Sequence, residues 1–368
     1  MITRKQARGW SALGAAALLT MGVAGCTSGS GSGTAPVSSA SGASGSATAS
    51  ATPSFTEAQA QQVFERYVRE RQAATEKGDT EALARVEDGQ LLKENRAEAQ
   101  LHQANGTKNE PIRPVRPVYL IPRTGSGEPQ SFAVLSKTEG RETDRSSTLT
   151  FFTRDRAGGE WKAVVATWVV TEAPSTTAPT DAPSSTPAPG QRSVRPTVMP
   201  ALARGASGGV ELSPTAETDA GVCGRYAQYL SFTVPAGKPE SADFERGDFT
   251  SGLVDYFNGW DQKVLERSLS FRSLTNALPT FRLKDGGSLV TCTLEGTYLD
   301  RGRTPANWIE PDGDTDALLG RGRKWSSIEE VWSVPAVVEV PQGGGPATVL
   351  SSEAYGATKL SVTGVEWK

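Results

Sequence analysis

The 368-residue sequence contains little histidine, cysteine or methionine, with one histidine, three cysteines and three methionines. A catalytic triad with a histidine base, or a zinc site with several histidines, would have to be built around His102 alone. No Cys-x-x-Cys pair is present, and no glycine-rich phosphate loop follows a predicted strand. We therefore expect no cofactor, no metal, and no nucleotide or redox chemistry, and we interpret His102 as an exposed helical residue.

Clustered positive charge is also missing. The formal net charge is −3, from 38 basic and 41 acidic residues. Residues 1–25 hold three basic side chains and no acidic ones, so their removal would change the net charge to −6. Binding to nucleic acid and attraction to anionic lipid headgroups both depend on clustered Lys and Arg. We therefore expect neither nucleic-acid binding nor electrostatic attraction to a membrane surface.

The sequence does contain a signal for export. A positive segment with Arg4, Lys5 and Arg8 precedes an apolar run, and Val23-Ala24-Gly25-Cys26 matches the lipobox of bacterial lipoproteins. The run falls short of the ~20 apolar residues that cross a bilayer. We predict cleavage after residue 25 and acylation of Cys26, with palmitate-type chains, which would anchor the protein to the extracytoplasmic face of the cell membrane. The alternative is an ordinary secretory signal that happens to contain a cysteine.

Two segments have the composition of linkers. Residues 26–53 are almost entirely Ser, Gly, Ala and Thr, and residues 172–197 combine six prolines with Ser, Thr and Ala. Neither can bury enough apolar surface to offset the entropy of ordering. The sequence therefore predicts a disordered tether, a stiffer linker, and two folded domains over residues 54–171 and 198–368.

The first domain begins with helical patterns and ends with strands. The capping-box spacing of Ser54 to Glu57 predicts the start of a long helix that ends at Gly78-Asp79. A short helix to Val86 and a third helix over 90–104 follow. Alternating runs separated by turn residues predict an antiparallel meander, with strands over residues 115–122, 130–138, 146–154 and 161–170. Helices followed by a sheet indicate an α+β fold.

This order of elements, together with the turn Gly78-Asp79-Thr80-Glu81-Ala82-Leu83, resembles the NTF2-like (cystatin-superfamily) fold over residues 54–171. The resemblance implies a curved sheet that wraps a cone against the long helix. The overall layout also resembles uncharacterised lipoproteins from high-GC Gram-positive bacteria. That resemblance supplies a cellular location but no activity.

The second domain repeats the order of helices and then strands. Helices are predicted over residues 219–230 and 248–269, and strands over 280–284, 288–299, 325–340 and 347–367. We therefore predict an α+β chain with two helix-plus-curved-antiparallel-sheet (NTF2-like/cystatin-like) domains in tandem, after a disordered, lipidated N-terminus.

Two cysteines remain once Cys26 carries lipid. Cys223 and Cys292 lie 69 positions apart in the second domain, both on predicted regular elements. In an oxidising compartment they could form a disulfide between the first helix and the central sheet of that domain. The alternative is a pair of separate buried thiols.

Three carboxylates alternate in one predicted loop, at Asp312, Asp314 and Asp316. In an EF-hand numbered from Asp312, the sixth position is glycine and the twelfth is glutamate, but Ala317 and Arg323 stand there. We therefore expect a solvated acidic loop that leads into a short helix, and no metal.

Aromatic residues gather in the second domain, at Trp308, Trp325, Trp332 and Tyr298. Such a group could form a platform for cell-wall sugars. Trp325 and Trp332 differ by an odd number, so in an unbroken strand they would lie on opposite faces of the sheet. At least one is therefore expected in a core.

Two classes of function remain. The first is a non-catalytic binding or scaffolding module at the cell envelope, for a protein, peptide or lipid ligand. The second is an enzyme with an NTF2-like cavity, in which an Asp or Glu works beside a tyrosine such as Tyr67 or Tyr119. No catalytic residue can be assigned by spacing, and a plain spacer without a ligand is a third alternative. An open cavity with a buried carboxylate beside a tyrosine hydroxyl would favour the enzyme, and a filled cone would favour surface recognition.

Overall fold

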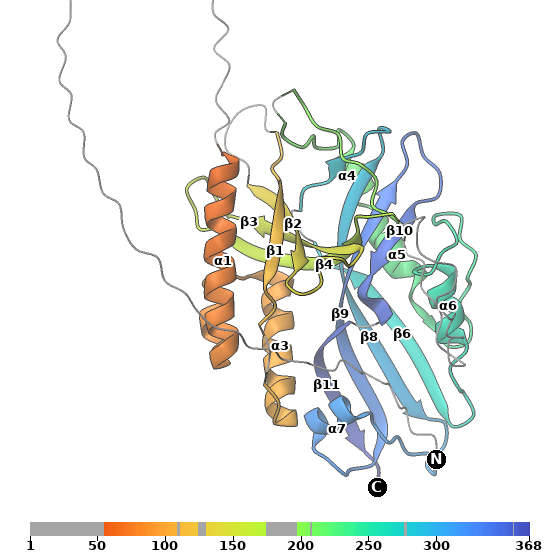
Figure 1. Ribbon diagram of the computed structural model, residues 1–368. Coiled ribbons are helices and arrows are strands. Elements are labelled where there is room, and N and C mark those ends of the chain that lie inside the picture. Colours follow the sequence, from red (N-terminus) through yellow and green to blue (C-terminus); the bar gives the residue numbers. More distant parts are fainter. Residues whose placement is uncertain are drawn as a thin grey trace, which may run out of the picture. The chain divides into compact units, whose positions relative to one another are not determined.

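A computed structural model describes residues 55–108, 111–123, 130–173, 197–206, 208–275, 278–355 and 357–368. These described residues belong to one compact unit (Figure 1). The signal segment, the tether and Cys26 lie outside the described residues, as does nearly all of the segment 172–197. The predicted domain boundaries therefore stay predictions.

Three helices open the described chain. They are α1 (Glu57–Lys77), α2 (Thr80–Leu83) and α3 (Gly89–Asn105). A capping box does start α1, but it is formed by Thr56 and Gln59 and not by Ser54 and Glu57 as predicted. Gly78 and Gly106, with φ of 65° and 64°, end α1 and α3 in the left-handed conformation that glycine adopts without strain.

The first sheet is the predicted antiparallel meander. Its strands are β1 (Pro114–Leu120), β2 (Ser131–Thr138), β3 (Ser146–Thr153) and β4 (Lys162–Val170), in the order β1-β2-β3-β4. Each neighbouring pair is antiparallel, and each strand lies within two residues of its predicted range at both ends. β1 is an edge strand.

The second half of the described chain, residues 197–368, has short helices and a larger sheet. Its helices are α4 (Ala216–Asp219), α5 (Val222–Tyr229), α6 (Ser251–Asn258) and α7 (Gly313–Leu319), with a 3-10 turn η1 (Glu353–Tyr355). Its strands are β5 (Phe232–Thr233), β6 (Leu265–Ser273), β7 (Phe281–Arg282), β8 (Ser288–Gly302), β9 (Trp325–Val340), β10 (Thr348–Ser352) and β11 (Thr358–Glu366). They form a curled seven-stranded antiparallel sheet, in which β10 and β11 pair with different parts of β9. The predicted α+β class is confirmed.

The prediction of one helix over residues 248–269 is wrong. α6 ends at Asn258, and Leu265 already begins β6. Leu265, Leu269 and Phe271 have spacings that also fit alternate positions of a strand, and cross-strand pairing with β8 fixes them there.

The first sheet is buried on both faces. On one face, Phe132 and Phe152 pack against α1. On the other, Leu149 and Phe151 share a core with Val337 and other residues of the second half. The two sheets of the described chain therefore have a common core. The helix α1 covers the far side of the first sheet, and α3 extends from β4 along β11 of the second sheet toward α7 (Figure 1).

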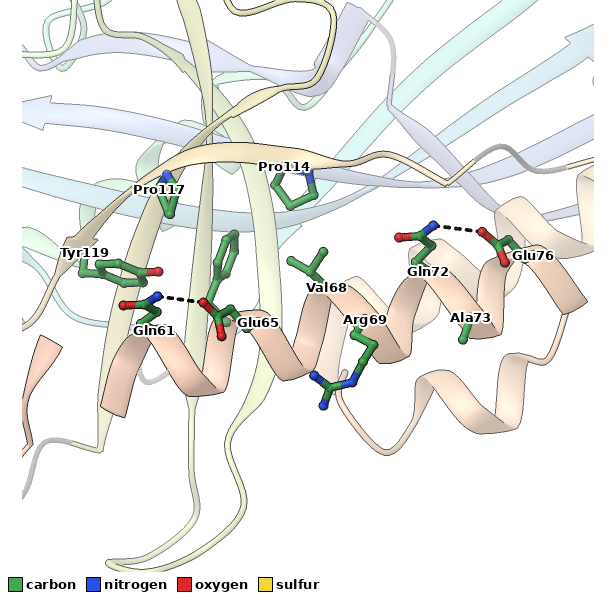
Figure 2. A pocket seen from close by; sticks show the side chains of 11 residues that line it. Gln61, Glu65, Val68, Arg69, Gln72, Ala73, Glu76, Pro114, Pro117 and Tyr119 are labelled. Carbon is green, nitrogen blue, oxygen red and sulfur yellow. Dashed lines mark hydrogen bonds between the residues drawn. The ribbon is translucent and has the colours of Figure 1, made fainter. Parts of the chain in front are cut away.

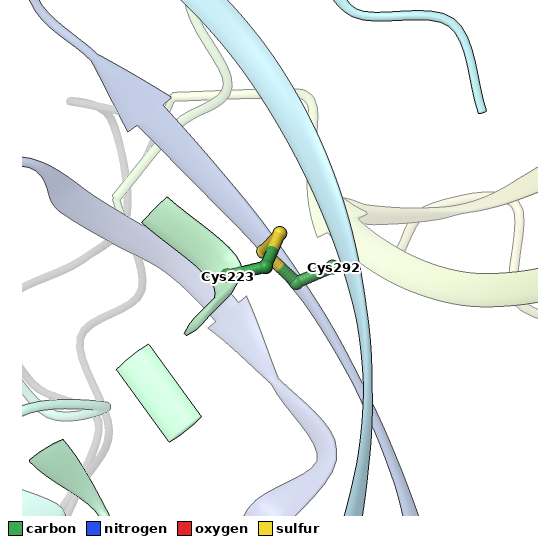
Figure 3. Close-up of a disulfide and its surroundings, with 2 residues drawn as sticks. All are labelled: Cys223 and Cys292. Carbon is green, nitrogen blue, oxygen red and sulfur yellow. A yellow bond between two sulfur atoms is a disulfide. The ribbon is translucent and has the colours of Figure 1, made fainter. Parts of the chain in front are cut away.

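Cys223 of α5 and Cys292 of β8 form a disulfide with an S–S distance of 2.06 Å (Figure 3). Both residues are buried in the core of the second half, among side chains of α5, α6 and the curled sheet. The crosslink holds α5 against β8 of the curled sheet. Among the described residues, no helix combines the length and apolar character needed to cross a bilayer.

Removal of this disulfide should destabilise the second half. In the chain-entropy model, a closed loop of this length is worth about 4 kcal/mol. We expect the double variant Cys223→Ala/Cys292→Ala to lose that order of unfolding free energy in urea denaturation. Dithiothreitol should lower the midpoint of the wild type but not that of the variant, and an equal midpoint for wild type and variant would contradict the crosslink.

Candidate functional site

An open groove runs between helix α1 and the edge strand β1 (Figure 2). Its volume is about 700 Å³. Along α1, lining residues recur at intervals of three and four positions, so that they lie on one side of the helix. The lining residues are Gln61, Phe64, Glu65, Val68, Arg69, Gln72, Ala73 and Glu76 from α1, with Pro114, Pro117 and Tyr119 from β1.

The β1 wall owes its shape to an irregularity in the strand. The register with β2 shifts between Val115 and Val118, and Arg116 has a φ of 52°. A positive φ is unusual for arginine and marks local backbone strain, which is common at binding sites. Pro114 and Pro117 flank this irregularity and face α1 (Figure 2). Because proline has no N–H group, they also hinder addition of a further strand at this edge.

The floor of the groove is apolar and its rim is charged. The Tyr119 ring lies edge-on to Phe64, with 6.3 Å between the centroids. On the rim, the Gln61 amide donates to Glu65 at 2.7 Å, and the Gln72 amide donates to Glu76 at 2.9 Å. The groove therefore combines an apolar floor with hydrogen-bonded carboxylates.

The electrostatic environment at the Tyr119 end of the groove is acidic. Partial burial raises the pKa of the Tyr119 hydroxyl, and the carboxylates of Glu65 and Glu57 raise it further. Neither carboxylate forms an ion pair within the described part of the chain. A ligand with positive charge at this end would meet complementary charge.

A polar network lies behind α1, on the side away from the groove. The Glu87 side chain is fully buried, and the Arg71 guanidinium donates to it at 3.1 Å. Asn95 donates to the same carboxylate at 2.8 Å, and Tyr67 also hydrogen-bonds it. Burial raises the pKa of Glu87, and Arg71 opposes that shift. Burial also raises the pKa of the Tyr67 hydroxyl.

Aromatic rings fill the space between the helices and the first sheet. The Phe132 and Phe152 rings are stacked with centroids 4.9 Å apart, and Trp161 lies edge-on to Phe132 at 4.9 Å. The Tyr67 ring packs edge-on against Phe152 at 5.3 Å. Tyr67 and Glu87 therefore do pair, as an acid–base site would require, but neither lines the groove.

His102 lies near the end of α3 and is partly buried. Its Nδ1 atom is 2.7 Å from the Thr107 hydroxyl, and its Nε2 atom is 3.5 Å from Glu98. The predicted helical location is correct, but the side chain is less exposed than expected because it packs into the helix end.

The three aspartates near α7 each hold a different partner. Asp312 caps α7 by accepting from the Thr315 amide at 2.8 Å, Asp314 accepts from Asn105 at 3.1 Å, and Asp316 accepts from the Gly322 amide at 3.1 Å. The predicted short helix is present, but α7 begins at Gly313, so that Asp314 and Asp316 lie within it and only Asp312 precedes it. Within the described ranges, no three His, Cys, Asp or Glu side chains are grouped so that they could hold a metal ion.

The four aromatic residues of the second half do not form one platform. Trp325 is 5% exposed in a small core with Ile309. Trp332 and Tyr298 pack together against the core of the second half, with ring centroids 5.5 Å apart. Trp308 stands apart from them, with the Lys324 ammonium 4.2 Å from its ring centroid.

No single motif of the sequence predicts the groove. Tyr119 was a candidate, but as part of an internal cone. Pro114 and Pro117 could have been noticed, because two prolines within a predicted strand indicate an edge strand. The acidic residues of the interior, such as Glu87, carry no local pattern that separates them from surface glutamates.

The comparison with known protein families gives one result. The family described as "Domain of unknown function (DUF8094)" matches residues 51–184 and 188–359. Searches against curated proteins and against solved structures gave no significant match.

Replacement of Arg71 should show how much the buried Glu87 carboxylate lowers the unfolding free energy when it has no cation beside it. We expect Arg71→Met to lower the unfolding free energy at pH 7 by about 3 kcal/mol, because an uncompensated carboxylate is left in the interior. The loss should shrink as the pH falls, since protonation of Glu87 removes that charge. Urea denaturation at pH 7 and pH 5 measures both effects.

The matched control is the double variant Arg71→Met/Glu87→Gln, which should recover most of the loss at pH 7. If the double variant is as unstable as the single variant at both pH values, the charge of Glu87 is not the cause.

Proposed function

The chain belongs to the DUF8094 family, and we propose that this member is a non-catalytic binding module, held at the extracytoplasmic face of the cell membrane by lipid on Cys26. The observation that carries the binding proposal is the groove between α1 and β1, which is open to solvent while the interior beneath α1 is filled by aromatic rings.

Two features support the location. The lipobox at Val23 to Cys26 follows a charged and then apolar segment. The disulfide Cys223–Cys292 is typical of proteins that fold in an oxidising compartment outside the cytosol.

The dimensions of the groove favour an extended peptide segment as its ligand. The lining of α1 extends from Gln61 to Glu76, a rise of about 22 Å along the helix. About seven residues of extended chain cover that length. The floor of Phe64 and Val68 accepts apolar side chains, and the acidic Tyr119 end favours basic ones. We therefore propose that the ligand is an extended, apolar peptide of a protein partner that carries basic residues.

The alternative, an enzyme with an internal acid–base site, has less support. Tyr67 and Glu87 form the required pair, but Arg71 and Asn95 hold the carboxylate, and packed rings occupy the space where a substrate would bind. A general base must lie within hydrogen-bond reach of its substrate.

The resemblance of the first half to the NTF2-like fold is also part of the proposal. The long helix, the short helix after Gly78 and the four-stranded meander support it. The second half has helices of four to eight residues and a seven-stranded sheet, so a tandem of two such folds has weaker support.

A matched pair of substitutions tests the groove. Ala73 and Ala58 both lie exposed on α1, but only Ala73 lines the groove. Peptides selected from a random seven-residue library against residues 53–368 should bind Ala73→Glu at least tenfold more weakly than wild type, because the larger side chain fills the groove. Ala58→Glu should bind them like wild type, and Glu65→Gln should weaken basic peptides several-fold.

The proposal fails if selected peptides bind all three variants equally well. Isothermal titration calorimetry gives the affinities, and amide chemical-shift changes confined to α1 and β1 would locate the contact.

Acylation is tested separately on the native product from a high-GC Gram-positive host. Intact-mass analysis should find a diacylglyceryl group on an N-terminal Cys26, and the protein should fractionate with membranes. Cys26→Ala should abolish the modification and release the protein from the membrane fraction. An unmodified N-terminus in the wild type would contradict the anchor.

A further inference from the structure

A second, smaller cavity lies where α3 and the first sheet meet the second sheet. Its volume is about 160 Å³. It is bounded by α3, β4, β9, η1 and β11, so that both halves of the described chain contribute to its wall. The lining residues are Glu94, Ala166, Ser333, Pro335, Glu353 and Thr358.

Two carboxylates from different halves face this cavity. Glu94 lies on α3 and accepts a hydrogen bond from the Ser333 hydroxyl of β9. Glu353 lies on η1 and accepts hydrogen bonds from the backbone and the side chain of Trp168 in β4. Each carboxylate is thus hydrogen-bonded to an element of the opposite half, and together they connect α3 and β4 to the second sheet.

No cation compensates this pair within the described residues. On α1, the guanidinium of Arg71 is bound to Glu87. On β11, the ammonium of Lys359 is occupied by Glu330 at 3.1 Å and by Asp312 at 3.5 Å. Glu87 adds a further negative charge on the side of α3.

We propose that Glu94 and Glu353 form a proton-dependent latch, which holds α3 against the second sheet while a carboxyl group is protonated and loosens when both are ionised. Protonated carboxyls need no counter-ion in a closed seam. Two carboxylates on the same cavity repel each other, and neither forms an ion pair with a cation of the described residues.

The pKa values of Glu94 and Glu353 lie near neutral pH, so their protonation changes between mildly acidic and neutral solution. Burial raises the pKa of both Glu94 and Glu353 to about 7, and Glu353 and Glu87 contribute to the shift of Glu94. In the unfolded chain both titrate near the ordinary glutamate value of 4.5. A group whose pKa is higher in the folded state contributes most stability below its unfolded pKa, and this contribution is lost as the pH rises to the folded pKa. The latch should therefore weaken between about pH 4.5 and pH 7.

Opening of the seam should be visible in α3. This helix also contacts β11 and α7, and Asn105 at its end bonds to Asp314 and Arg321. Loss of the latch would release the middle of α3, while α1 stays attached to the first sheet through its aromatic core. The latch therefore does not depend on the proposed function of the groove.

The test is hydrogen–deuterium exchange at pH 5 and pH 8, corrected for the intrinsic pH dependence of exchange. It uses the mature chain, residues 26–368, with Cys26→Ser to keep it free of lipid. In the wild type, the amides of α3 should open at least tenfold more at pH 8 than at pH 5. In Glu94→Gln/Glu353→Gln this difference should disappear, and each single variant should be intermediate.

The matched control is Glu329→Gln, an exposed residue on β9 of the second sheet that does not line the cavity, which should behave like wild type. Equal pH dependence in the wild type and the double variant would overturn the proposal. If the double variant does not fold, carboxyl carbon chemical shifts of the wild type decide the matter. Midpoints near 7 for both side chains support the latch, and midpoints near 4.5 overturn it.

Discussion

The structure depends on burial of both faces of the first sheet. Phe151 and Phe152 are neighbours in β3, and both are fully buried, one against the second half and one against α1. Because side chains alternate along a strand, two such neighbours require a covering layer on each side. The helices supply one layer and the second sheet supplies the other, so the position of the groove and that of the acidic cavity both follow from this sheet.

Much of the secondary structure was predictable because local signals agreed with the tertiary packing. In the first half, turn residues and helix caps separate the elements, and the strands came out almost as predicted. The helix error at 259–269 arose where Leu265 and Leu269 fit either period and only pairing with β8 decides. The shared core of the two sheets was not predicted, although the run Phe132-Ala133-Val134-Leu135 has the continuous apolar character of a strand buried on both faces.

The candidate sites were less predictable than the fold. A groove arises from the distance between α1 and β1, and neither segment encodes that distance by itself. The pairing of Glu94 with Glu353 joins residues far apart in the sequence, through the contact of two halves that were predicted as separate domains. The aspartates at 312–316 carried the clearest local pattern, yet Asp312 and Asp316 accept from nearby backbone amides, while Asp314 accepts from Asn105, 209 positions away on α3. Local motifs report caps and turns, whereas these sites depend on packing.

The helices α1 and α3 and the loop before α3 hold two acidic sites of opposite character. Glu87 has a guanidinium and an amide beside it, so its charge is satisfied and α1 is fixed to the loop before α3. Glu94 lies two turns further along, and within the described residues it accepts a hydrogen bond from the neutral hydroxyl of Ser333. A carboxylate beside a cation is stabilised in its ionised form, whereas a carboxylate without a cation takes up a proton at a higher pH. The α1 wall of the groove therefore lies beside the compensated carboxylate of Glu87, and the proposed response to protons lies where α3 meets the second sheet.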